Sequence, residues 1–287
     1  MDYDISQTTH LMGGDLRITI TSPHPQKALQ AINAAFQEAK RLEGIFSVYD
    51  PQSELSRLNK ERTLTVSKDL RTVLWRARWH AEISGGLFNP AIGNEIIAAK
   101  NYIQNGGTPP HKPIHDGHYR KIKFDGKTVS LGHAPYTIDL GGIAKGYIVD
   151  KLVETLKKEG TKQGIVDARG DIRVFGPRPI KIQVEDPQDS KKSKHTFMLK
   201  DAAVATSGNY RQHREKTGHI INPFNTPPQI LSASVIKETC ADADALTKTI
   251  FNLPLAKAIS AINHGVIIAS DGKVHAKGIA AATTEAA

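Results

Sequence analysis

Apolar and polar residues follow two different periods along the chain, and each period predicts one type of element. Residues Leu16–Ile20 alternate between apolar and polar, which is typical of a strand with one buried face. In the following segment, Pro25–Phe46, apolar residues recur at positions 29, 32, 36, 39 and 42. This spacing is close to the helical period, so it predicts an amphipathic helix.

The same two patterns divide the rest of the chain into helices and strands. A second helix is predicted over Ser67–Ile83, with Ser67 as its N-cap and Gly85–Gly86 as its stop. A third helix begins near Lys145 and ends at Gly160. Further strands are predicted at 164–168, 169–174, 180–184, 195–199, 203–207 and 231–237, and further helices at 241–251 and 255–263.

The order of these elements indicates the fold class. Strands and helices are mixed without a regular β-α-β repeat, which predicts an α+β fold with mixed or antiparallel sheets and packed helices. We find no internal repeat and no long linker. Residues 1–287 are therefore expected to form one domain, or two closely packed subdomains.

The composition is that of a soluble globular protein with a basic surface. Hydrophobic residues make up 39% of the chain and charged residues 23%, as is ordinary for this class. The net charge of +9 is scattered, and its densest run, Lys191–Lys194, follows the polar segment Asp186–Ser190. We interpret this run as a solvated loop rather than a nucleic-acid contact, so no nucleic-acid partner is predicted. A basic surface still favours anionic partners such as nucleotides.

The single cysteine and the N-terminal sequence bear on the cellular compartment. One cysteine, Cys240, excludes an internal disulfide and a cysteine-based zinc site, and a small buried thiol is favoured there over a nucleophile. No apolar stretch is long enough to span a bilayer, and Met1–His10 is too polar for a signal-peptide core. The protein is expected to be cytoplasmic or, if an export leader has been removed, periplasmic or attached to the cell envelope.

Three histidines lie in a polar segment, Asn105–His118, that is rich in glycine and proline. His111, His115 and His118 could be imagined as metal ligands. Their spacing offers no helix or strand on which they would converge, so an exposed loop is the favoured interpretation.

The segment Tyr136–Gly146 predicts a site for phosphate. It reads as a strand that ends on Asp139, turns through Gly141 and Gly142, and opens a helix beside Lys145. Glycines allow close approach of a ligand to the backbone, and a helix N-terminus presents partial positive charge to an anion. The segment matches neither standard phosphate-loop motif, so an ordinary strand–helix turn remains the alternative.

A second candidate site lies in the predicted helix that begins after Cys240. Asp244 faces the same side of this helix as Thr247 and Lys248, because residues three and four positions apart are neighbours. Oxygen ligands grouped in this way suit Mg²⁺, which completes its shell with phosphate and water. The alternative is that Asp242 and Asp244 only occupy a first helical turn, where negative charge is favourable.

These two segments belong to a longer series of ordered matches that resembles a family. The chain is similar to the ApbE family of flavin transferases, which use FAD to attach FMN through a phosphoester bond to a threonine or serine of a target flavoprotein. The strongest match is Ile138–Tyr147. In chain order, the matching blocks are 11–14, 46–49, 53–59, 84–90, 138–147, 205–208, 218–223, 234–236 and 243–246.

The resemblance implies an ApbE-like α+β fold with the active site in a central cleft, and it implies roles for particular residues. The positions that it assigns to FAD contact are Met12, Tyr49, Leu87, Phe88, Asn89, Asp139, Lys145 and Ile221. The positions that it assigns to Mg²⁺ are the main-chain oxygen of Gly142, and Asp244, Thr247 and Lys248. Cation and lysine would stabilise the charge that develops as AMP leaves.

The three catalytic candidates that follow are Asp244, Lys145 and His219. Asp244 would act through the metal, and Lys145 through the phosphates. His219 is a candidate to accept the proton of the target hydroxyl, although packing or contact with the flavin would explain it equally well.

The chain departs from the family pattern at four places. Lys248 stands where the family has threonine, Asn89 where aspartate is common, and Arg169 where the family has glycine. The segment Pro223–Thr226 also differs from the family's P-x-T-G. A protonated lysine cannot ligate a metal, so three readings of Lys248 are open: its ammonium takes part of the metal's electrostatic role, Thr247 compensates, or the side chain points to solvent.

Two functions are therefore expected as alternatives. The first is an active FAD:protein FMN transferase that uses FAD and Mg²⁺ and acts on a partner flavoprotein with a threonine or serine motif. The second is a catalytically impaired flavin-binding relative, or a weak FAD pyrophosphatase, with an altered metal site. The chain shows no convincing copy of the target motif, so modification of itself is not expected.

Overall fold

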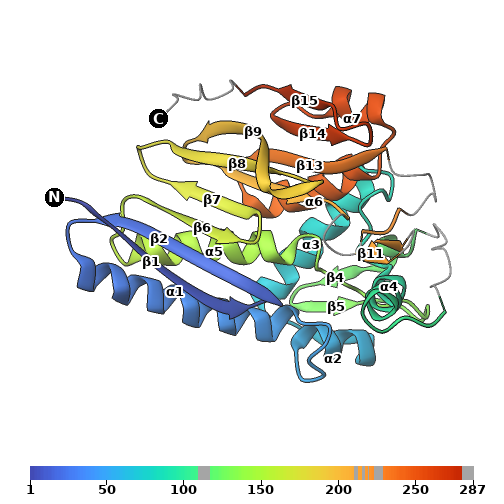
Figure 1. Ribbon diagram of the computed structural model, residues 1–287. Coiled ribbons are helices and arrows are strands. Elements are labelled where there is room, and N and C mark those ends of the chain that lie inside the picture. The colour runs from blue at the N-terminus through green and yellow to red at the C-terminus, as the bar shows by residue number, and fades with distance from the viewer. Residues whose placement is uncertain (109–116, 210–212, 215–216, 219, 223–228, 280–287) are drawn as a thin grey trace.

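The computed structural model describes residues 1–108, 117–209, 213–214, 217–218, 220–222 and 229–279. Its centre is an eight-stranded sheet in which every neighbouring pair of strands is antiparallel (Figure 1). In spatial order the strands are β1 (Tyr3–Leu11), β2 (Gly14–Ser22), β6 (Gly164–Ala168), β7 (Asp171–Phe175), β10 (Ala203–Ser207), β13 (Ile230–Lys237), β14 (Gly265–Ala269) and β15 (Val274–Lys277).

Helices cover one face of this sheet. The helices α1 (Pro25–Phe46), α5 (Ala144–Lys158) and α6 (Cys240–Phe251) follow one another across it, with α3 (Lys68–Ile83) packed behind (Figure 1). The alternation in β2 places Leu16, Ile18 and Ile20 in the core beneath α1, where all three are fully buried. Alternating apolar residues therefore bind the sheet to its helical layer by burial from water.

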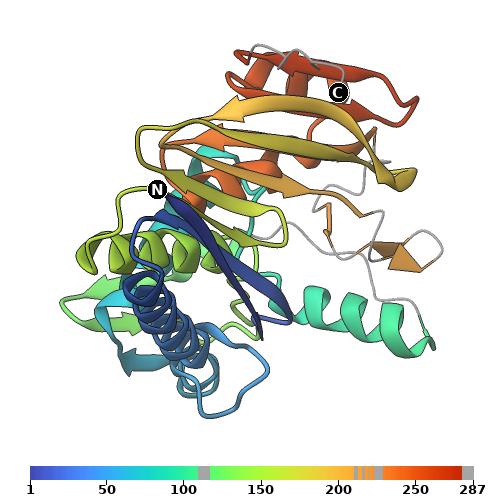
Figure 2. The same ribbon diagram turned by 60° about the vertical axis from the view of Figure 1, so that its left-hand side comes forward.

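A β-hairpin covers part of the opposite face. Strands β8 (Ile180–Asp186) and β9 (Asp189–Leu199) pair with each other and pack a second apolar cluster against β7, β10 and β14 (Figure 2). Phe197, from β9, is fully buried in this cluster. The prediction of a loop at Lys191–Lys194 was wrong, because these residues belong to β9. Lys191, Lys192 and Ser193 are all exposed in this strand and Lys194 is half-buried, so their polarity reflects exposure.

Smaller elements complete the molecule beside the helices. A three-stranded sheet has the order β3 (Thr63–Thr65), β5 (Thr128–Ser130) and β4 (Lys123–Asp125). The remaining elements are α2 (Glu54–Glu61), α4 (Gly93–Asn105), the 3₁₀ helix η1 (His118–Lys121), α7 (Leu255–Ala261), and the short pair β11 (His213–Arg214) and β12 (Thr217–Gly218). The architecture confirms the α+β prediction.

The predicted helices are confirmed because their signals are local. Helix α1 spans the predicted residues, and Ser67 caps α3 by accepting a hydrogen bond from the N–H of Leu70 at 3.2 Å. Two strand predictions were wrong. Tyr136–Asp139 forms no strand, and the side chain of Asn59 bonds both the N–H and the C=O of Ile138. Arg169 and Gly170 form a turn instead of the start of β7, with positive φ angles of 58° and 95°.

Several expectations about single residues can now be placed. Cys240 is fully buried, and this burial raises the pKa of its thiol well above the ordinary value, as expected of a packing residue. His118 stacks on the ring of Tyr136, with the ring centroids 4.8 Å apart, while His111 and His115 lie outside the described residues. Among the described helices, none has the length and apolar character that crossing a membrane requires.

Candidate active site

A cavity of about 820 Å³ opens between the turn that joins β1 to β2, the start of α5, the turn that joins β6 to β7, and α6. This volume lies within the range of sites that hold large cofactors, roughly 300–1,000 Å³. Its lining includes all eight positions predicted to contact FAD: Met12, Tyr49, Leu87, Phe88, Asn89, Asp139, Lys145 and Ile221. The fold thus brings together residues that are widely separated in sequence.

The glycine turn before α5 forms one wall of the cavity. Asp139 is almost buried, and its Oδ1 accepts a hydrogen bond from the N–H of Gly141 at 2.7 Å, so this carboxylate shapes the turn. A side chain at Gly142 would place its Cβ 3.1 Å from the ring of Phe88 and 3.5 Å from Cγ of Lys248. Gly142 is therefore required for close packing at the cavity wall.

The first turn of α5 supplies positive charge. Ile143 at its N-cap offers no side-chain hydrogen bond, and the neighbouring Ala144 and Lys145 line the cavity. The ammonium of Lys145 contacts the buried carboxylate of Asp171. Burial alone would lower the pKa of Lys145, but the charges of Asp171 and Asp244 outweigh it and raise the pKa above the ordinary value. Lys145 is therefore a permanent cation beside a helix N-terminus, an arrangement that favours anions.

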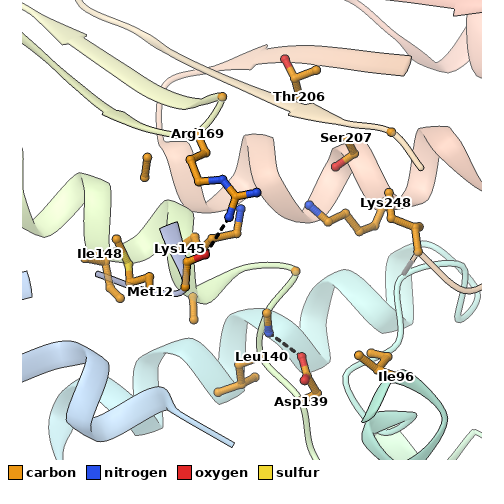
Figure 3. Close-up of a pocket in the computed structure, with 18 of the residues that line it drawn as sticks. Met12, Ile96, Asp139, Leu140, Lys145, Ile148, Arg169, Thr206, Ser207 and Lys248 are labelled. Carbon is orange, nitrogen blue, oxygen red and sulfur yellow. Dashed lines mark hydrogen bonds between the residues drawn. The ribbon is translucent and has the colours of Figure 1, made fainter. Parts of the chain in front are cut away.

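Helix α6 carries a second lysine–aspartate pair, whose lysine lines the same cavity. Asp244 is fully buried; its Oδ2 accepts a hydrogen bond from the N–H of Gly146 at 3.4 Å, and its Oδ1 contacts the ammonium of Lys248. The Lys248 side chain is only 18% exposed and lines the cavity, so it does not point to bulk solvent. Figure 3 shows Lys248 and Lys145 on opposite sides of the cavity floor.

The hydroxyl of Thr247 is fully engaged within the protein. It donates to the main-chain oxygen of Asp244 at 2.7 Å, which leaves the hydroxyl of Ser207, also 2.7 Å away, as a donor to it. The ammonium of Lys248 donates to the same oxygen at 3.4 Å. Both lone pairs of the hydroxyl oxygen therefore have donors, and Thr247 does not compensate as a metal ligand.

The donor set does not fit Mg²⁺. Gly142, Asp244 and Thr247 do come together, but an ammonium already contacts the Asp244 carboxylate, and the Thr247 oxygen has no free lone pair. Within the described part of the chain, no group of three or more His, Cys, Asp or Glu side chains is placed to hold a metal. Mg²⁺ depends on oxygen ligands, and a neighbouring ammonium would repel it.

Asp242 lies on another side of α6 and takes no part in the cavity. Its carboxylate bonds the ring of His80 at 3.0 Å and the guanidinium of Arg76 at 3.2 Å, both on α3. It also accepts a hydrogen bond from Thr239, the N-cap of α6, at 2.7 Å. Asp242 therefore lies in the first turn of α6, where negative charge is favourable, as the alternative interpretation expected. That interpretation does not hold for Asp244.

Two side chains at the rim and wall have capacity for a ligand. Asn89 is 7% exposed; its oxygen accepts from the N–H of Ala91, while its buried Nδ2 has no hydrogen-bond partner among the described residues. A buried amide donor without a partner is costly, so a ligand acceptor there would remove the cost. Tyr49 is 62% exposed, with the ammonium of Lys100 5.3 Å from its ring centroid.

Sequence reasoning missed three contributors to the site. Asp171 pairs with Lys145, Ser207 supports Thr247, and Lys100 approaches Tyr49. Asp171 and Ser207 carried a signal, since Asp171 ends the segment in which Arg169 departs from the family's G-G-D pattern and Ser207 lies in the matching block 205–208, whereas Lys100 carried none. Arg169 was noted as a departure, and the fold places it in the cavity wall, where it donates to the main-chain oxygen of Gly13 at 2.8 Å (Figure 3).

Some predicted positions lie outside the described residues. These are His219, the candidate proton acceptor, and all of Pro223–Thr226. The adjoining Ile221 is described, and its main-chain oxygen accepts a hydrogen bond from the side chain of Asn252 at 3.2 Å. The role of His219 stays a prediction.

Comparisons with known proteins identify the family to which the fold belongs. The model of the ApbE family matches residues 12–269. The FAD:protein FMN transferase of Treponema pallidum is 26% identical over 289 residues, which cover 88% of this chain and 80% of that protein. The protein of the same name from Klebsiella pneumoniae is 24% identical and covers 90% and 85%. The crystal structure of the ApbE protein from Thermotoga maritima superposes with a TM-score of 0.82, at 25% identity, over 97% of both chains.

Proposed function

The chain belongs to the ApbE family, and from this premise we propose that it is an FAD:protein FMN transferase. Its substrates would be FAD and a partner flavoprotein that carries a threonine or serine in a flavinylation motif. The observation that carries the proposal is one cavity of about 820 Å³ whose floor combines the glycine turn, the N-terminus of α5 and the Lys145 ammonium.

The reaction exchanges one phosphorus–oxygen bond for another. The hydroxyl oxygen of the acceptor attacks the phosphorus on the flavin side of FAD, and the bond from that phosphorus to the bridging oxygen breaks. The electron pair and the bridging oxygen leave with AMP, and the hydroxyl proton is released. The products are a protein–FMN phosphoester, AMP and one proton.

The residues of the cavity suit each part of this reaction. Lys145, held by Asp171, and the first amides of α5 would stabilise the negative charge that develops on the phosphates. The exposed ring of Tyr49 offers a surface for a planar ring system, and the unpartnered Nδ2 of Asn89 offers a donor to a ligand oxygen. Positioning and charge stabilisation together account for most catalysis of phosphoryl transfer.

The alternative of an impaired relative is less favoured. The glycine turn and Lys145, which the resemblance assigns to the reaction, line one cavity, and the buried Asp244 contacts Lys248, which lines the same cavity. The resemblance also implies a magnesium requirement, which does not enter this proposal because the donor set does not fit Mg²⁺. No step above depends on a metal, because the ammonium of Lys248 contacts the carboxylate that would bind it.

The test is mass spectrometry of an acceptor flavoprotein domain after incubation with this protein and FAD. We expect the acceptor to gain the mass of FMN less one water, with one AMP released for each modified acceptor. The matched control is the acceptor whose motif threonine or serine is replaced by alanine, which should gain nothing. Release of FMN and AMP without a mass change in the acceptor would show a hydrolase instead.

A further inference from the structure

We infer that Lys248 is a built-in cation for the pyrophosphate of FAD, occupying the position at which the family pattern calls for a divalent metal, so that this protein binds FAD without Mg²⁺. The inference rests on the proposed function for the identity of the ligand. The oxygen atoms of Gly142, Asp244 and Thr247 do not fit Mg²⁺, because the ammonium of Lys248 contacts the Asp244 carboxylate.

The first argument is that the fold holds Lys248 in place. Its ammonium contacts Asp244 one helical turn earlier and lies 3.4 Å from Thr247 Oγ1. Its stem passes beside Gly142, where an added Cβ would lie 3.5 Å from Cγ and 3.6 Å from Cε of the lysine. A lysine fixed between α6 and the glycine turn has lost most of its side-chain freedom before a ligand arrives, which is the condition for effective electrostatic stabilisation.

The second argument is that the ammonium points to the place where phosphate is expected. Lys248, Gly142 and Lys145 all line the same cavity, and Gly142 belongs to the turn that precedes the N-terminus of α5. A phosphate at that N-terminus would lie between the two lysines. An ammonium has three donors, so Lys248 can contact Asp244 and Thr247 and still present one N–H to a phosphate oxygen.

The third argument comes from the second departure in the same cavity. Arg169 replaces a glycine of the family pattern, and its guanidinium also lines the cavity, with one N–H donated to the main-chain oxygen of Gly13. Lys248 and Arg169 each carry one positive charge at neutral pH, and together they equal the charge of one divalent cation. Two departures that each add a cation to one cavity are consistent with replacement of a metal by side chains.

The test compares the wild-type protein with Lys248→Thr, which restores the family residue, and with Lys100→Thr as a control. Lys100 also lines the cavity but contacts the ring of Tyr49 instead of a carboxylate, so its loss changes the charge equally without opening the Asp244 site. Binding of Mn²⁺ to each FAD complex is measured by electron paramagnetic resonance. FAD affinity is measured by flavin fluorescence in EDTA and in Mg²⁺.

For the wild type we expect no stoichiometric Mn²⁺ and FAD affinities in EDTA and Mg²⁺ that agree within about twofold. For Lys248→Thr we expect one bound Mn²⁺ and FAD affinity that falls about tenfold or more in EDTA and recovers in Mg²⁺, because Asp244 becomes free to ligate. Lys100→Thr should respond to metal as the wild type does. Lys248→Met, which keeps the stem of the side chain, replaces Lys248→Thr if that variant does not fold.

Stoichiometric Mn²⁺ on the wild-type FAD complex, or a tenfold loss of wild-type FAD affinity in EDTA, would overturn the inference. An unchanged metal response in Lys248→Thr would do the same. If FAD and Mn²⁺ bind as expected but no FMN is transferred to the acceptor, the proposed function is rejected and the inference about Lys248 stands. Absence of FAD binding under all conditions would reject both.

Discussion

The two faces of helix α6 carry aspartates only two residues apart, and these aspartates belong to different parts of the molecule. Asp242 faces α3, where it bonds His80 and Arg76, and it also bonds Thr239, the N-cap of α6. Its side chain is 31% exposed. Asp244 faces the start of α5 and is fully buried, and it contacts Lys248, which lines the cavity. One carboxylate joins two helices, and the other holds a lysine at the floor of the candidate active site.

The comparison teaches that the partners of a carboxylate, and not its type or helical position, decide its role. For Asp242, burial alone would raise the pKa, but hydrogen bonds from His80 and Thr239 and the charge of Arg76 lower it to about 2. Asp242 is therefore stabilised as an anion by structural contacts. Asp244 has as partners a backbone N–H and the ammonium that also lines the cavity.

The largest effect is expected from Asp244→Asn. The amide keeps the shape of the side chain but removes the charge that holds Lys248, so the rate of FMN transfer should fall by about 100-fold or more, the order observed when one preorganised electrostatic group is lost. Single-turnover transfer at saturating FAD measures this. Asp242→Asn is the matched control, and equal losses of transfer rate in the two variants would remove the distinction between the two faces of α6.

Asp242→Asn should instead lower stability. Asp242 has a pKa near 2 in the folded protein against an ordinary value of 3.8, and its partial exposure reduces the corresponding free energy by solvent screening. We expect the free energy of unfolding at pH 7 to fall by about 1–2 kcal/mol. Urea denaturation measures it, and an unchanged midpoint would show that the contacts with α3 contribute nothing to stability.

The same contribution should depend on pH in a defined window. A folded pKa that lies below the unfolded value means that the stabilisation is present above about pH 4 and is lost as the pH falls through the folded pKa of about 2. The difference in stability between wild type and Asp242→Asn should therefore shrink across this range. A difference that stays constant down to pH 2 would exclude the ionised carboxylate as its cause.

The smallest effect is expected from Ser207→Ala. Ser207 lines the cavity and donates a hydrogen bond to Thr247, and both residues are buried. Its loss should cost about 0.5–1.5 kcal/mol of stability, the usual value for one such bond, and change FMN transfer only slightly. Thermal unfolding and the transfer assay measure the two quantities. A loss of transfer as large as that of Asp244→Asn would place Ser207 in the reaction itself.

Much of the fold could be predicted from the sequence, because the signals were local. Helical periodicity and the Ser67 cap located α1 and α3, and the regular series of apolar positions after Lys145 located α5. The elements that were missed, such as α4, the buried strand β14 and the edge strand β15, lack strong local periodicity or clear caps. Long-range contacts decide whether such segments form a helix or a strand.

By itself, the sequence determined the helices and the apolar faces that bury them, because periodicity and capping are written along the chain. The resemblance to the ApbE family implied the set of residues from Met12 to Ile221, which the structure places around one cavity. Only the tertiary structure decided that Asp171 holds Lys145, that Asn59 bonds the backbone of Ile138, and that Lys248 turns to Asp244. The physical reason is that hydrogen bonds and ion pairs act over a few ångströms in space, whatever the separation in sequence, so the partners of a polar group are known only when the chain has folded.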